Sequence, residues 1–176
     1  MMLRTLIFCP LALLFSLLTA QEPWQDPTVI GRNKQPAHAT LLPYPSEAAA
    51  LSFERSQTPW YKSLDGEWRF QFAFNPDLAP ADFFEPGYDD SDWAFLPVPA
   101  NWQLHNFGQP IYTNIKHPFP ADPPRVPTDK NETGCYRRSF VLPPDWEKDK
   151  RIFLHFAGVQ SACYVWLNGQ KVGYSE

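Results

Sequence analysis

The sequence contains little cysteine and little glycine. Three cysteines and eight glycines occur among 176 residues. The glycines are too few and too scattered for a loop that cradles a nucleotide phosphate, and no Cys/His spacing resembles a zinc site. The Gly-x-Ser-x-Gly and His-Glu-x-x-His motifs are also missing from the chain. The sequence therefore lacks the usual signatures of nucleotide-binding proteins, serine hydrolases and zinc peptidases.

Basic residues are also in the minority. Lysine and arginine number 15 and the acidic residues 19, which gives a formal net charge of −4. No stripe of basic residues runs along any segment of the chain. Nucleic acids and anionic membrane surfaces are therefore not expected as partners.

The sequence has a single long apolar run, at its N-terminus. A basic start at Arg4 precedes the apolar residues 6–18, and small residues ending at Ala20 are followed by the polar Gln21. This order is typical of a secretory signal peptide, which we assign to residues 1–20. The run is 13 residues long, short of the roughly 20 needed to span a bilayer. The mature protein is expected to be secreted or periplasmic, without a membrane span; an uncleaved anchor is the alternative.

Two cysteines, Cys135 and Cys163, lie outside this leader. An oxidising compartment would permit a disulfide between them. Two buried free thiols are the alternative and the preferred interpretation. The distance between the two residues, which would decide the question, cannot be obtained from the sequence.

Proline and aromatic residues are abundant, with 20 prolines and an aromatic content of 16%. Trp68, Phe70, Phe72 and Phe74 alternate with less apolar residues, as in a half-buried β-strand. Further strands are expected at 93–98, 111–113, 136–142, 151–156, 163–167 and 170–174. The 151–156 strand is expected to be buried on both faces. Asn168-Gly169 between the last two is the preferred sequence for a type I′ hairpin turn.

The chain divides into regions that differ in the periodicity of their apolar residues. Residues 21–58 show no periodicity and are predicted to form an extended N-terminal arm, with a short helix that Ser46 caps. Residues 59–176 are predicted to form one domain. The proline-rich residues 116–133 form a long surface loop within it. Many short strands and few helices indicate an all-β sandwich or jelly roll, and we expect it to be truncated at its C-terminal end.

Two polar clusters could have a function. Asp89, Asp90 and Asp92 could supply oxygen ligands to calcium, although aspartates that bond to their own backbone in a turn are the preferred interpretation. Asn101 follows a strand and is bracketed by Pro99 and Trp102. Its amide has two donors and an acceptor, which suits a sugar hydroxyl; the alternative is a capping Asn101 beside a tryptophan in the core.

Several motifs resemble the N-terminal sugar-binding domain of large bacterial-type β-galactosidases, in glycoside hydrolase family 2. They appear in the family's order across residues 60–176: SLDGEWRF at 63–70, VPANWQ at 98–103, PIYTN at 110–114, PT at 127–128, TGCY at 133–136, FAGV at 156–159, WLNG at 166–169 and VGY at 172–174.

The resemblance implies a galactose-binding-like jelly-roll domain in a retaining hydrolase of terminal β-D-galactosides. In that family two glutamates on a later barrel domain perform catalysis, so this chain alone is expected to be inactive and to contain no catalytic residue. Asn101 matches the family asparagine that contacts the galactosyl group. The implied partners are the immunoglobulin-like and barrel domains of the parent chain. Mg²⁺ or Na⁺ is implied for the full-length parent only, and no metal ligand is assigned here.

Other functions remain open from the sequence. A stand-alone carbohydrate-binding module or a purely structural jelly roll could use the same strand pattern. β-Glucuronidases and β-mannosidases share the architecture, although the NWQ and PIYTN motifs favour the galactosidases.

We predict that the leader is removed between Ala20 and Gln21. Expression in a secreting host and N-terminal sequencing of the product should give a mature chain that begins at Gln21, with a net charge of −5 from 14 basic and 19 acidic residues. A product that still begins at Met1 or Met2 would contradict the predicted location.

Overall fold

The computed structural model describes residues 22–112, 114, 118–146 and 150–176, so the predicted signal peptide lies outside it. This part of the chain contains one α-helix, four short 3-10 turns and six strands. The helix is α1 (Glu47–Leu51), and the turns are η1 (Pro23–Gln25), η2 (Arg55–Gln57), η3 (Pro76–Leu78) and η4 (Trp102–His105). The strands are β1 (Gly31–Arg32), β2 (Gly66–Ala73), β3 (Ala94–Val98), β4 (Thr133–Arg137), β5 (Cys163–Leu167) and β6 (Gln170–Ser175).

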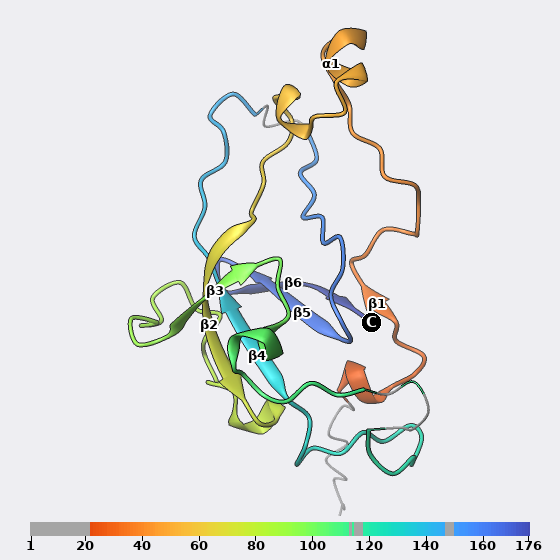
Figure 1. Cartoon of the computed structure of the whole chain (residues 1–176), viewed down its shortest axis with the longest axis vertical. Helices are drawn as coiled ribbons and strands as arrows, with labels where there is room; N and C mark the ends of the chain where they lie inside the picture. The colour runs from red at the N-terminus through yellow and green to blue at the C-terminus, as the bar shows by residue number, and fades with distance from the viewer. Residues whose placement is uncertain (1–21, 113, 115–117, 147–149) are drawn as a thin grey trace, which may run out of the picture.

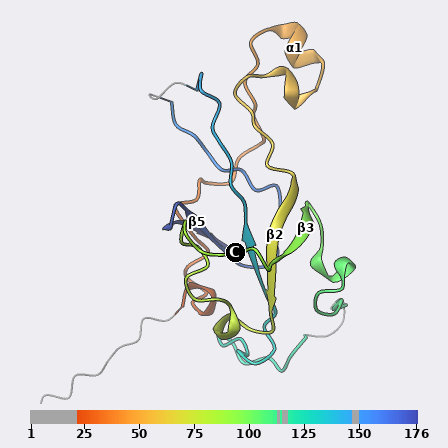
Figure 2. The ribbon, with the colours of Figure 1, turned by 90° about the vertical axis from the view of Figure 1, so that its left-hand side faces the viewer.

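The strands form two three-stranded antiparallel sheets. One sheet has the order β3-β2-β4 and the other β1-β6-β5. Seen from the side, β5 lies to one side of the molecule and β2 and β3 to the other (Figure 2). The expected all-β sandwich is therefore confirmed.

The core of the first sheet is built on Phe70 of β2. Its side chain is fully buried, as is that of Leu96 on β3. The Phe70 ring lies 4.8 Å from the rings of Phe107 and Tyr136 and 5.8 Å from that of Trp102, measured between centroids. Each aromatic pair contributes about 0.5–1.5 kcal/mol beyond its buried area. The period-two pattern of β2 thus places one large ring at the centre of the sheet.

The strand predicted at 136–142 begins earlier and ends sooner than expected. β4 pairs with β2 from Ala73↔Thr133 to Arg69↔Arg137 and then stops. The next residue, Arg138, donates from its guanidinium to the backbone carbonyls of Leu64 and Asp65, at 2.6 and 3.0 Å. These bonds tie the chain to the residues just before β2 through a side chain, and residues 138–142 form no strand.

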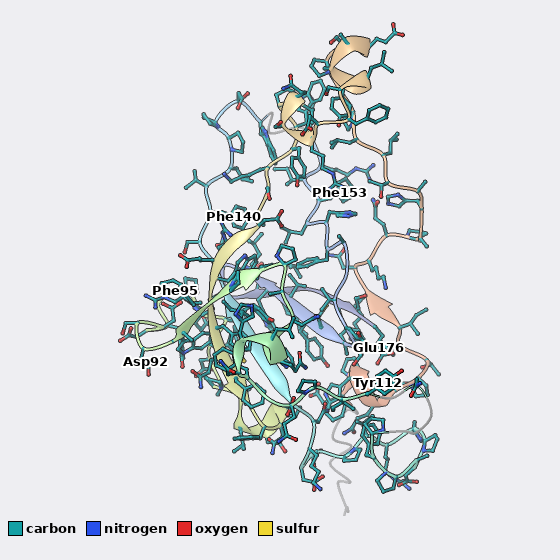
Figure 3. The ribbon with its side chains drawn as sticks, viewed as in Figure 1. Asp92, Phe95, Tyr112, Phe140, Phe153 and Glu176 are labelled. Carbon is teal, nitrogen blue, oxygen red and sulfur yellow. The ribbon has the colours of Figure 1, made fainter. Side chains whose placement is uncertain are left out.

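Other predicted strand residues lack a pairing partner in the described part of the chain. Phe74 lies just beyond the last pair of β2, and 66% of its surface is exposed. Residues 151–156, predicted to be a strand buried on both faces, are neither paired nor buried. Phe153, for example, is 55% exposed, and Figure 3 shows it on the long segment beyond the sheets.

Ile111 and Tyr112 form no strand either, and residue 113 lies outside the described residues. Sequence propensity for a strand is insufficient without a partner strand.

The arm is extended, and one part of it joins the second sheet. β1 pairs with β6 through Gly31↔Ser175 and Arg32↔Tyr174. Nearby, Lys34 Nζ donates to Ser175 Oγ at 2.7 Å. Farther along, α1 lies at one end of the molecule, away from both sheets (Figure 1). Its expected cap is confirmed, since Ser46 Oγ accepts a hydrogen bond from Ala49 N at 3.2 Å.

The predicted hairpin between β5 and β6 is confirmed. Asn168 and Gly169 both have positive φ, at 52° and 81°, as a type I′ turn requires. The Trp166 ring on β5 stacks on Phe84 at 5.3 Å, with 7° between the planes. Phe84 belongs to the connection between β2 and β3, so this stack joins the two sheets.

Cys135 and Cys163 are both free thiols. Burial raises the pKa of Cys135 to about 11, so this thiol stays protonated and unreactive at neutral pH.

We predict that Gly134→Ala destabilises the fold by about 1–3 kcal/mol, the usual cost of overpacking. A methyl group at this position of β4 would lie 2.7 Å from Phe70 Cε2 and closer still to the Trp102 ring. Gly87→Ala is the matched control, because nothing lies within 4 Å of its added methyl group. Denaturant unfolding of both variants tests the prediction, and equal stabilities would contradict it.

Candidate functional site

Asn101 lies where β3 passes into the η4 turn. β3 ends at Val98, and Asn101 is the last extended residue before η4, with φ −92° and ψ 121°. Its carbonyl accepts the first bond of the turn, from Leu104 N at 3.0 Å. Asn101 therefore occupies an N-cap position.

The turn that carries Asn101 is anchored on both sides. Trp102 packs 5.8 Å from Phe70, and Phe107 packs 4.8 Å from the same ring. Phe107 N also donates to Trp102 O at 3.2 Å. Trp102 within the turn and Phe107 just after it thus pack on the same core ring, Phe70. This packing fixes the backbone at Asn101.

The Asn101 side chain is exposed and makes no cap hydrogen bond within the described η4 turn. Asn101 therefore begins the turn through its backbone carbonyl and not through its side chain, and the half-buried Trp102 packs against the core ring of Phe70. By contrast, Asn75 at the same position of η3 accepts a hydrogen bond from Leu78 N at 3.0 Å. An amide that the fold does not use, on a fixed backbone, can bond a ligand hydroxyl with little loss of entropy.

The aspartates at 89 and 90 bond to groups of the protein itself. Asp89 Oδ1 accepts from Ser91 N at 3.0 Å, as the turn interpretation predicted. Asp90 instead pairs with Arg137 at 2.8 Å and faces Arg69 at 4.0 Å. In the described ranges, no three potential ligands among His, Cys, Asp and Glu come together to hold a metal ion.

Three aspartates have a lowered pKa. Hydrogen bonds from Thr28 lower the pKa of Asp26, and those from Ser91 lower the pKa of Asp89. The hydrogen bond from Arg125 lowers the pKa of Asp122. A glycosidase acid needs the opposite, a raised pKa. These groups are held in their charged form.

The groups at the end of β6 bond to one another and to the arm. Glu176 Oε1 accepts from the Tyr174 hydroxyl at 2.6 Å, and Lys34 Nζ donates to Glu176 O at 3.3 Å. An ammonium group already occupies this position.

One cavity of about 240 Å³ was not foreseen. It is lined by Pro23, Arg32 and Asn33 of the arm and by residues 171–174 of β6. Its two sides are more than 130 residues apart in sequence, since Asn33 bonds Val172 across 139 positions, so no local pattern could have revealed it. Over the described residues, no helix is long and apolar enough to cross a membrane.

The fold and the exposed amide define an all-β domain suited to binding a polar ligand. Residues 61–176 match the family described as "Glycosyl hydrolases family 2, sugar binding domain". The chain belongs to this family.

Several relatives are named beta-galactosidase. The chain is 40% identical to that of Priestia megaterium over 155 residues, and 41% identical to that of Psychromonas ingrahamii over 162. These alignments cover 86% and 92% of this chain and 15% of each relative. A beta-galactosidase of Aeromonas hydrophila is 41% identical over 167 residues, which are 90% of this chain and 16% of the relative. The matched part of the chain thus spans 15–16% of the length of these relatives.

Comparing two asparagines tests whether Asn101 has a structural role. Asn101→Ala should change the free energy of unfolding by less than about 0.5 kcal/mol, because its side chain caps nothing. Asn75→Ala should cost about 0.5–2 kcal/mol, the usual loss for a cap. Thermal or denaturant unfolding of both variants gives the comparison. An equal loss for Asn101→Ala would make it a capping residue after all.

Proposed function

We propose that this chain is the sugar-binding domain of a β-galactosidase that hydrolyses terminal β-D-galactosides, and that Asn101 contacts the galactosyl group. The free amide of Asn101 on its anchored turn carries this proposal. The relatives named beta-galactosidase support galactose as the sugar.

The catalytic carboxylates belong elsewhere in the parent protein. A retaining glycosidase needs two carboxyl groups about 5–5.5 Å apart, one with a raised pKa. The lowered pKa values of Asp26, Asp89 and Asp122 are unsuited to that work. The domain therefore contributes binding and orientation of the sugar, and the chain alone is inactive.

Other domains of the parent, immunoglobulin-like and barrel, are the proposed partners. The exposed apolar side chains of residues 151–156 support this, among them Ile152 at 48% and Phe156 at 50% exposure. Such surface in a soluble protein usually marks an interface. The N-terminal leader of the sequence supports export of the whole protein.

Kinetics of the parent enzyme test the role of Asn101. In a β-galactosidase that carries this domain, Asn101→Ala should lower kcat/KM for nitrophenyl galactoside about tenfold or more. A neutral hydrogen bond is worth about 0.5–1.5 kcal/mol, and more if it tightens in the transition state; each 1.36 kcal/mol is a factor of about ten. The chain alone should give no turnover in the same assay.

Asn75→Ala is the control. It should lower the thermal midpoint of the parent enzyme but leave its kcat/KM within about twofold, because Asn75 is not proposed to contact the substrate. Normal kinetics for Asn101→Ala, or turnover by the chain alone that a carboxylate variant abolishes, would refute the proposal.

A further inference from the structure

The cavity between the arm and β6 contains two cations that have no carboxylate within ion-pair distance among the described residues. Arg32 comes from β1 and Lys171 from β6, and both line the cavity. Neither forms an ion pair with any described residue. The cavity lining itself includes no acidic side chain.

A β-bulge brings the two cations to one face of the sheet. The pairing of β5 with β6 passes from Val165↔Gly173 to Trp166↔Lys171, so Val172 has no partner. Residues directly opposite each other share a face, and a bulge turns the next side chain to the other face. Without the extra residue, Lys171 would point away from the face that carries Tyr174.

The shared face is aromatic. Tyr174 pairs with Tyr164 on one side and with Arg32 on the other. Lys171 Nζ lies 3.8 Å from the centroid of the Tyr164 ring and 5.8 Å from that of Trp166. These rings position the ammonium without using its hydrogen-bond capacity, since a cation over a ring keeps its N–H groups for other acceptors.

The nearby acids are occupied by other partners. Glu22 Oε2 accepts from the Tyr164 hydroxyl at 3.0 Å. Asp26 Oδ1 accepts from the backbone N and the hydroxyl of Thr28, at 3.0 and 2.7 Å. Arg32 lies near enough to Asp26 to help lower the pKa of that carboxyl group. This carboxylate therefore moderates the positive potential of the cavity, which favours a small anion bound at modest affinity.

We propose that this cavity binds a small oxyanion, a free sulfate or phosphate or the carboxylate of an acidic sugar. Arginine presents a planar fork of donors to two oxygens at once, and lysine adds a point charge. The volume of about 240 Å³ is below the usual 300–1,000 Å³ of drug-sized sites, which suits such a ligand. The bound oxyanion would bridge β1 and β6 and hold the arm on the sheet. The site does not involve Asn101, so it goes beyond the proposed function.

Titration of the chain followed by amide NMR tests this site. Sodium sulfate and sodium galacturonate, at constant ionic strength set with sodium chloride, should each shift the resonances of Gly31 and Gly173 saturably, and neutral galactose should not. A dissociation constant at least tenfold lower for galacturonate would identify the acidic sugar as the ligand. A dissociation constant at least tenfold lower for sulfate would identify a free inorganic anion as the ligand.

Two charge-neutralising variants locate the ligand. Arg32→Gln and Lys171→Gln should each weaken oxyanion binding about tenfold or more, because each removes one of the two charged donors. Lys62→Gln, an exposed lysine outside the cavity lining, is the matched control and should bind as the parent chain does. Both cavity side chains are exposed, so the variants should keep their thermal midpoints. The proposal is overturned if the two cavity variants bind as tightly as the control, or if the parent chain shows no saturable shift.

Discussion

The first sheet and the candidate sugar site both depend on the approach of Trp102 to Gly134. Only a residue without a side chain on β4 lets the indole reach Phe70, the fully buried ring of the central strand. That packing closes the core over β2 and simultaneously fixes the turn that begins at Asn101. The packing of Trp102 therefore stabilises the core and also positions the neighbouring Asn101 amide for a ligand. The indole Nε1 is buried there without a hydrogen-bond partner among the described residues, which is the polar cost of this anchor.

Arg137 joins the loop between β2 and β3 to the first sheet. Arg137 on β4 bonds Asp90 and the carbonyls of Phe83 and Glu85. The same loop carries Phe84, which stacks on Trp166 of the second sheet. Charged groups of one sheet thus order the loop whose aromatic ring reaches the other. The two sheets are joined through side chains and not through a shared strand.

Local patterns in the sequence were sufficient for β2, β3, the β5–β6 hairpin and the Ser46 cap, because each depends on neighbours a few residues away. They were insufficient where pairing depends on distant groups. β4 ends at Arg137, and the contact that follows it joins the Arg138 side chain to Leu64 and Asp65, more than 70 positions away. The position of Asn101 was predictable from its motif, whereas its freedom from capping was visible only in the structure. The Arg32–Lys171 cavity depends on a bulge and on a strand from the arm, and neither has a local signal.

The pairing of Gly31 with Ser175 also determines when β1 can join its sheet during synthesis of the chain. The two residues are 144 positions apart, so β1 must wait for β6 before it can join the sheet. At about 5–20 residues per second on the ribosome, that wait is roughly 7–30 s. The hairpin β5–β6 closes within microseconds once it is made. Among the described strands, β1 is therefore made first but can pair only after β6 has been made, and the arm stays free to bind a chaperone during that interval.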